Sequence, residues 1–177
     1  LLGGVLFLLL FMQHGALWLA IRTTGDLQEQ AVSTAKKLWP VLLAVAVIFL
    51  IASWFATDLY DNYFANPAFF LVILLAVGGL LGSRFFVIQE AYFKAWFASA
   101  LTIIGCTFFG VVGLFPSLFP SSIDPGFSLT AFNASSSPLT LKIMLIVVLL
   151  FVPIVLAYQI WAYNLFKTKV IEEDMIY

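Results

Sequence analysis

The chain has 177 residues, of which 63% are hydrophobic and only 10% are charged. Soluble domains carry about 25% charged residues, so eight basic and nine acidic side chains are too few to cover a water-exposed surface. The net charge of −1 gives no electrostatic basis for binding nucleic acid. A single cysteine excludes an internal disulfide and a zinc or iron–sulfur site built from cysteines. The composition therefore indicates an integral membrane protein.

Five apolar stretches are long enough to cross a bilayer as helices, which takes about 20 residues each. The first begins at residue 1 with no initiator methionine or basic segment before it, so we expect residue 1 to lie inside a longer polypeptide. Pro116 is expected to end the fourth helix, and Ser137 followed by Pro138 is typical of a helix start. We therefore predict one all-α membrane domain over residues 1–177, with spans at about 1–21, 38–57, 68–88, 95–115 and 142–166.

The basic residues predict the orientation of these spans. Seven of the eight fall on one side of the membrane, and only Lys142 falls on the other. The positive-inside rule makes the basic side cytoplasmic. The four prolines of the longer outer loop favour a packed lid over a floppy linker. We expect outer loops at 58–67 and 116–141, inner loops at 22–37 and 89–94, and a cytoplasmic C-terminal tail at 167–177.

His14 is the single histidine of the chain and lies deep in the first span. Ionisable residues inside membranes often have a function, so a haem ligand and a proton relay are open interpretations. A neutral histidine bonded to a neighbouring helix or subunit is favoured, because one histidine cannot build a bis-histidine haem site. Asp58, at the outer end of the second span, is either a guard at a proton exit or a solvated helix end.

Glycines are grouped in the third and fourth spans. Gly78 and Gly82 have the G-x-x-x-G spacing with Gly79 beside them, and the fourth span carries Gly105, Gly110 and Gly113. Small residues let membrane helices approach closely, so these are predicted packing positions. The residues show no nucleophile–base pair, phosphate-binding loop or metal-ligand spacing. We therefore predict no catalytic and no metal-binding residues, and the sequence leaves cofactor-binding residues unassigned.

Two stretches carry a longer pattern. Residues 13–27 read QHGALWLAIRTTGDL, and the longer outer loop contains FPSLFPSS from Phe115, SLT from Ser128 and NASSSPLTL from Asn133. The pattern continues through residues 152–155 and Tyr158 of the last span. Together these residues resemble subunit II of the cytochrome bd quinol oxidases, including their cyanide-insensitive relatives. The resemblance covers essentially the whole chain, as the second half of that subunit.

The resemblance implies a fold of nine helices, arranged as two four-helix bundles plus one peripheral helix, of which this chain would supply the last five. It implies a complex with a larger subunit I that carries haem b, haem d and the external quinol-binding loop. Such a complex oxidises quinol, reduces dioxygen to water and generates a proton-motive force across a bacterial or archaeal cytoplasmic (inner) membrane. Small accessory subunits, lipid and quinone are further implied partners.

The resemblance also implies that this chain binds no haem, and that the family's buried acidic residues for proton access belong to the earlier helices.

Two other classes of protein function stay open. A transporter half would normally show broken helices or deep polar residues, and a pure assembly scaffold would have no influence on turnover. We expect a structural or interface role for His14, Arg22, Asp58, Ser121, Ser122, Asn133 and Ser135. Asp58 is included because it lies at the outer end of the second span, whereas the others belong to the motifs that carry the resemblance.

Overall fold

A computed structural model describes residues 1–166 and 168 of the chain. Five of its helices are long and apolar enough to cross a membrane, which confirms the predicted all-α membrane fold. The chain divides into two compact units, residues 1–114 and 115–168, and each is described by itself. The predicted tail at 167–177 lies outside the described residues, apart from residue 168.

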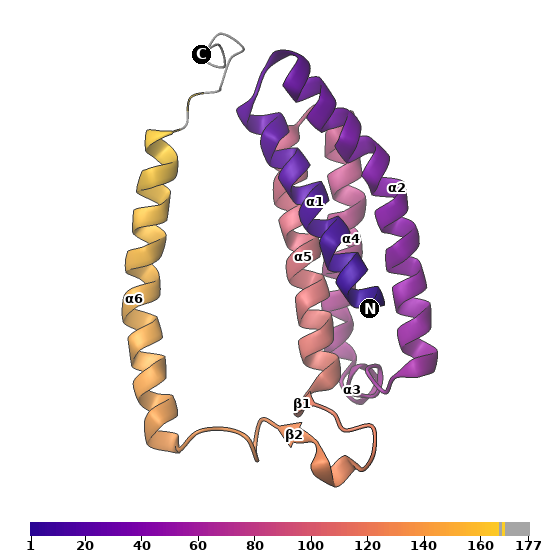
Figure 1. Cartoon of the computed structure of the whole chain (residues 1–177), viewed down its shortest axis with the longest axis vertical. Coiled ribbons are helices and arrows are strands. Elements are labelled where there is room, and N and C mark those ends of the chain that lie inside the picture. Colours follow the sequence, from indigo (N-terminus) through magenta and orange to yellow (C-terminus); the bar gives the residue numbers. More distant parts are fainter. Residues whose placement is uncertain (167, 169–177) are drawn as a thin grey trace. The chain divides into compact units, whose positions relative to one another are not determined.

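The first unit is a bundle of four long helices: α1 (Leu2–Arg22), α2 (Gly25–Ala56), α4 (Phe70–Ile88) and α5 (Tyr92–Leu114) (Figure 1). Helix α1 packs along α2 and α5, and α4 packs along α5 and more lightly against α2. Short turns join α1 to α2 and α4 to α5 at one end, called the turn end below. Two short helices, α3 (Asp61–Ala65) and the 3-10 helix η1 (Pro67–Phe69), join α2 to α4 at the opposite end, called the α3 end.

Two apolar clusters form the core of this bundle. The turn-end cluster is built mainly from alanines, whose small side chains let the four helices close together. The α3-end cluster is built from leucines. The turn-end cluster consists of Ala16, Leu17, Ala20, Ala31, Val32, Ala35, Val87 and Ala95, and the α3-end cluster of Leu6, Leu10, Leu42 and Leu80.

Helix α2 begins at Gly25, so most of the range 22–37, predicted as an inner loop, is helical. Hydropathy detects only the part of a helix that is apolar enough to lie in lipid. Residues 25–37 are too polar to be detected in this way, but they form a helix that buries Ala31, Val32 and Ala35 against the bundle. The turn before it depends on Gly25, whose φ of 64° suits a residue without a Cβ. Apolar length alone therefore places the span but misses the start of the helix.

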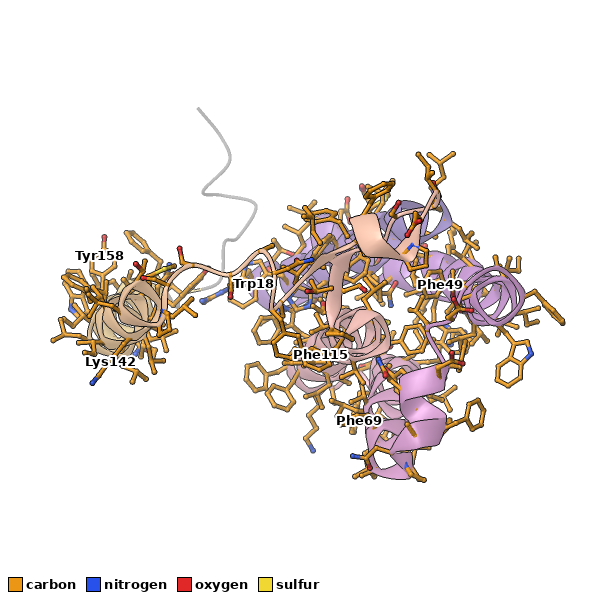
Figure 2. All side chains as sticks on the ribbon, turned by 90° about the horizontal axis from the view of Figure 1, so that it is seen from below. Trp18, Phe49, Phe69, Phe115, Lys142 and Tyr158 are labelled. Carbon is orange, nitrogen blue, oxygen red and sulfur yellow. The ribbon has the colours of Figure 1, made fainter. Side chains whose placement is uncertain are left out.

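The second unit contains a short hairpin and the last long helix. Strand β1 (Ser117–Phe119) pairs antiparallel with β2 (Leu129–Thr130), and the 3-10 helix η2 (Pro125–Phe127) lies between them. Helix α6 (Pro138–Leu165) begins as predicted, because the Ser137 side chain accepts a hydrogen bond from Thr140 N at 3.3 Å. Side chains project from α6 on all sides (Figure 2), and none of its described residues is buried.

Candidate functional site

A stack of four side chains runs along one face of α1 and onto α5. The Arg22 guanidinium lies 4.6 Å from the centre of the Trp18 ring, and the Trp18 ring lies 5.4 Å from that of Trp96. Trp96 in turn stacks on His14 at 5.0 Å, with ring planes 29° apart. Because His14, Trp18 and Arg22 are spaced by four residues, they share one face of α1. Two predicted candidates, His14 and Arg22, therefore belong to one contact between α1 and α5.

A hydrogen bond fixes the orientation of the His14 ring. Its Nδ1 lies 2.7 Å from Ser99 Oγ, across a sequence separation of 85 residues. The single hydroxyl proton of Ser99 is donated to the Trp96 carbonyl at 2.7 Å. With that proton on the carbonyl, the tautomer that satisfies both contacts is the one that carries its hydrogen on Nδ1. Sequence reasoning named His14 but not Ser99 or Trp96, because only the packing of α5 on α1 brings them together.

This arrangement fits a packing histidine better than a haem ligand. One face of the His14 ring is covered by Trp96, and its Nδ1 is bonded to Ser99. A cavity of about 50 Å³ lies among the bundle helices, and His14 is not among its lining residues. In the part of the chain that the structure describes, no three His, Cys, Asp or Glu side chains group to hold a metal ion. The contacts of His14 are therefore those of a packing residue, and its absence from haem ligation stays a prediction.

An aromatic cluster around Tyr63 closes the α3 end of the bundle. Tyr63 is 0% exposed, and its hydroxyl donates to the Phe109 carbonyl of α5 at 2.9 Å. Its ring contacts those of Tyr60, Phe69, Phe70 and Phe109 at centroid distances of 5.4–6.4 Å. Burial, and secondly the neighbouring Tyr60, raises the pKa of Tyr63 to about 12. Tyr63 is therefore a neutral donor that fixes α3 to α5.

Asn62 and Asp58 lie in the segment that leads into α4. Asn62 Nδ2 donates to the carbonyls of Val112 and Gly113 at 2.9 and 3.2 Å, and these are carbonyls that the end of α5 leaves without helical partners. Asp58 is exposed, and its backbone carbonyl accepts a hydrogen bond from Asp61 N at 3.2 Å. The structure thus places Asp58 at a surface turn. Its role at a proton exit stays a prediction.

Ser121 and Asn133 hold the hairpin of the second unit together. The Ser121 Oγ accepts from the backbone N–H groups two and three residues further on, at 3.2 and 3.4 Å. The Ser121 N–H donates to Ser128 Oγ at 3.0 Å. Asn133 accepts from Thr130 N through Oδ1 at 2.7 Å and donates to the Ser128 carbonyl through Nδ2 at 2.9 Å. Two predicted candidates therefore stabilise the loop itself.

Ser122 and Ser135, the other two candidates of this loop, are exposed. The bonds described for Ser121 and Asn133 do not involve either of them. A surface position leaves both side chains on the outside of the loop, where they do not contribute to these hairpin bonds.

Asn133→Ala is expected to loosen this loop. The substitution removes two side-chain hydrogen bonds of about 0.5–1.5 kcal/mol each, so local opening becomes easier by about 1–3 kcal/mol. Limited proteolysis of the complex should therefore cut within residues 116–137 faster than in the unmodified protein. Ser135→Ala is the matched control and should leave the rate unchanged. Equal cleavage of the two variants would show that Asn133 does not hold the loop.

Three glycines mark the places where backbones meet. A Cβ on Gly79 would lie 2.7 Å from a backbone oxygen of α5, one on Gly105 would lie 2.7 Å from a backbone nitrogen of α4, and one on Gly113 would lie 2.9 Å from a backbone oxygen just before α3. Gly78 has no atom within 4 Å of such a Cβ, and Gly82 has only ordinary contacts. The predicted Gly78–Gly82 motif is therefore not the close approach. Successive residues of an α-helix point in directions about 100° apart around the helix axis. Of these three glycines of α4, Gly79 is the one that faces α5.

The fold and these contacts define an all-α, multi-pass membrane protein whose polar side chains join helices and hold loops. The family model for cytochrome bd terminal oxidase subunit II matches residues 1–166. The chain belongs to this family, which confirms the resemblance seen in its motifs.

Relatives from three bacteria agree with the family. Cytochrome bd ubiquinol oxidase subunit 2 of Bacillus subtilis is 32% identical over 175 residues, which cover 98% of this chain and 51% of that protein. A probable cytochrome oxidase subunit 2 of Haemophilus influenzae is 31% identical, over 93% of this chain and 50% of that protein. Cytochrome bd-I ubiquinol oxidase subunit 2 of Escherichia coli is 28% identical, over 99% of this chain and 53% of that protein. The chain thus spans about half the length of the relatives it matches.

Proposed function

We propose that this chain is the supporting, non-haem-ligating part of subunit II in a bd-type terminal quinol oxidase. The family match over residues 1–166 carries this proposal. The complex would oxidise quinol, reduce dioxygen to water and generate a proton-motive force. Haem b and haem d, held by the larger partner subunit I, would carry the electrons. The contacts of His14 support this division of labour, because they are packing contacts between helices.

We further propose that the turn end faces the cytoplasm of a bacterial or archaeal cell and that the α3 end faces outward. The positive-inside rule supports this orientation, because basic residues gather at the turn end. One of them, Arg84, donates from Nη1 to the Lys36 carbonyl of α2 at 3.2 Å. The C-terminus would then be cytoplasmic. The basic residues of this end are Arg22, Lys36, Lys37, Arg84 and Lys94.

The candidate residues have two kinds of role in this proposal. His14 and Arg22 hold α1 against α5 through the tryptophan stack. Ser121 and Asn133 keep the hairpin in one shape. Ser122 and Ser135 are exposed on the same loop, where subunit I or an accessory subunit would contact them.

Purification of the complex through a tag on this chain tests the proposal. A dithionite-reduced minus oxidised absorption spectrum should show b-type bands together with the red-absorbing bands of haem d. Quinol-dependent oxygen consumption should accompany them. A stable, membrane-embedded preparation without haem would contradict the oxidase proposal and favour a transporter half.

His14→Phe separates packing from haem ligation. Phenylalanine keeps an aromatic ring against Trp96 but removes the hydrogen bond to Ser99, so we expect a lower yield of complex with unchanged band positions. Ser99→Ala removes the same bond while keeping the histidine, and it should behave in the same way. Loss or displacement of one haem's bands in His14→Phe alone, at an unchanged ratio of subunits, would identify His14 as a ligand.

A further inference from the structure

A groove of about 440 Å³ runs between α4 and α5, which lie side by side in the bundle (Figure 1). It opens to the surface of the first unit, because its lining residues Gly78, Phe93 and Phe97 are exposed. On the α4 side, Gly78 and Gly82 leave the groove without side chains, and a Cβ on Gly78 would meet no atom within 4 Å. Apart from Lys94, every side chain that lines this groove, called the α4–α5 groove below, is apolar.

The α4–α5 groove is about as long as one leaflet of a bilayer is deep. Its lining runs from Leu74 to Phe86 on α4 and from Phe93 to Leu101 on α5, which are about 18 and 12 Å of helix. The hydrocarbon core of a bilayer is about 30 Å thick, so one leaflet contributes about 15 Å. Phe86 and Phe93 lie next to the turn that joins the two helices, so the groove begins at the turn end. An acyl chain that enters there would fill it.

Lys94 places a positive charge at the turn end of the groove. Its Nζ lies 6.0 Å from the centre of the ring of Phe86, which also lines the groove. The described residues that line the groove include no Asp or Glu. Glu90, in the turn before α5, lines a separate hollow together with Lys36 and Lys37. The groove therefore combines an apolar length with a positive charge at one end.

The start of α5 adds to this positive charge. Lys94 is the third residue of α5, whose first turn contains no acidic residue. The N–H groups of a first helical turn have no acceptors within the helix, and together they act as about half a positive elementary charge. A lysine at this place is repelled by the helix dipole, whereas an anion is attracted both by the dipole and by the lysine. The electrostatics at the turn end of the groove therefore favour a negatively charged group.

We propose that the α4–α5 groove binds one acyl chain of an anionic phospholipid, whose phosphate group lies beside Lys94. Basic pockets between membrane helices bind anionic lipid headgroups in this way. The chain covers the exposed rings of Phe93 and Phe97 and fills the space that Gly78 leaves open. A quinone would fill the apolar length equally well, but its neutral headgroup offers Lys94 no opposite charge. A helix of another subunit would leave the lysine without an anion as well.

Electron cryo-microscopy of the complex in nanodiscs of phosphatidylglycerol tests the site directly. We expect elongated density along Gly78 and Gly82 that ends in a headgroup beside Lys94. A protein segment in the groove, an empty groove, or a chain without a headgroup at Lys94 overturns the proposal.

Thermal unfolding of the purified complex in detergent, titrated with phosphatidylglycerol or with phosphatidylcholine, gives a second readout. Phosphatidylglycerol should raise the unfolding temperature at a lower mole fraction than phosphatidylcholine does. Lys94→Gln should raise the half-saturating mole fraction of phosphatidylglycerol about fivefold, the worth of one lysine near an anionic lipid surface. Lys37→Gln is the matched control, because Lys37 is an exposed lysine of the same end that lines the separate hollow. Equal titrations of the two variants overturn the role of Lys94.

Gly78→Leu tests the apolar part of the groove. The new side chain would occupy the space of the acyl chain, so the rise in unfolding temperature with phosphatidylglycerol should shrink. Gly110→Leu is the control, since a Cβ at Gly110 also meets no atom within 4 Å and Gly110 does not line the groove. Its response to the lipid should equal that of the unmodified complex. An equal response in Gly78→Leu and Gly110→Leu shows that no chain lies in the groove.

Discussion

Gly105→Ala is expected to lower the free energy of unfolding of the bundle by about 1–3 kcal/mol, the usual cost of overpacking a close contact. The added Cβ would lie 2.7 Å from the backbone nitrogen and the Cβ of Ala76 on α4. Carbon atoms in contact prefer about 3.5–4.0 Å. Backbone atoms of a helix cannot rotate away as a side chain can, so α4 and α5 have to move apart. Thermal unfolding of the purified complex measures this loss.

Two neighbouring glycines supply the controls for this experiment. Gly110→Ala introduces the same methyl group five residues further along α5, where no atom lies within 4 Å. It should be neutral or stabilising by about 0.5–1 kcal/mol, since alanine is the better helix residue. Gly79→Ala and Gly78→Ala form a second pair, with the damaging substitution at Gly79. If Gly105→Ala unfolds at the temperature of Gly110→Ala, the close approach of α4 and α5 is not real.

The same glycines show what apolar length and spacing predict in a membrane chain. Hydropathy predicted five helices and the end of α5 before Pro116, because the membrane requires both length and internal hydrogen bonding. It did not predict the rotation of each helix about its own axis. Gly78 and Gly79 differ by about 100° in that rotation, and the choice between them depends on the partner helix. The prediction named both glycines as packing positions, and spacing alone does not tell which of them meets α5.

The candidate site was predicted in part, for a related reason. His14 and Arg22 stood out as a polar and a basic residue on one apolar helix, and their stacking through Trp18 follows the local spacing of four residues. The bond from His14 to Ser99 has no local signal, because 85 residues separate the two. Tyr63 was missed because α3 is five residues long. Its burial comes from contact with α5, whereas its sequence neighbours Asn62 and Phe64 are half-buried and exposed, respectively.

Tyr63→Ala is expected to cost about 3–5 kcal/mol of unfolding free energy, the range for removing a buried aromatic side chain. The ring is 0% exposed and contacts four other aromatic rings. Its loss leaves a cavity between α3 and the bundle and removes the hydrogen bond to the Phe109 carbonyl. Tyr63→Phe keeps the ring, so it should cost only the hydrogen bond, about 0.5–1.5 kcal/mol. Thermal unfolding of the two variants separates the ring from the hydroxyl.

Phe64→Ala is the neighbouring control, because this ring is 58% exposed, and it should lower the free energy of unfolding less than Tyr63→Ala does.

Cys106 reports on whether Tyr63 closes the α3 end of the bundle, since it lines the cavity of the bundle together with Phe109. Alkylation requires the thiolate, which forms where water reaches the sulfur. If loss of the Tyr63 ring lets water into the cavity, maleimide should label Cys106 faster in Tyr63→Ala than in Phe64→Ala. Equal unfolding temperatures and equal labelling in the two variants would show that Tyr63 does not close this end of the bundle.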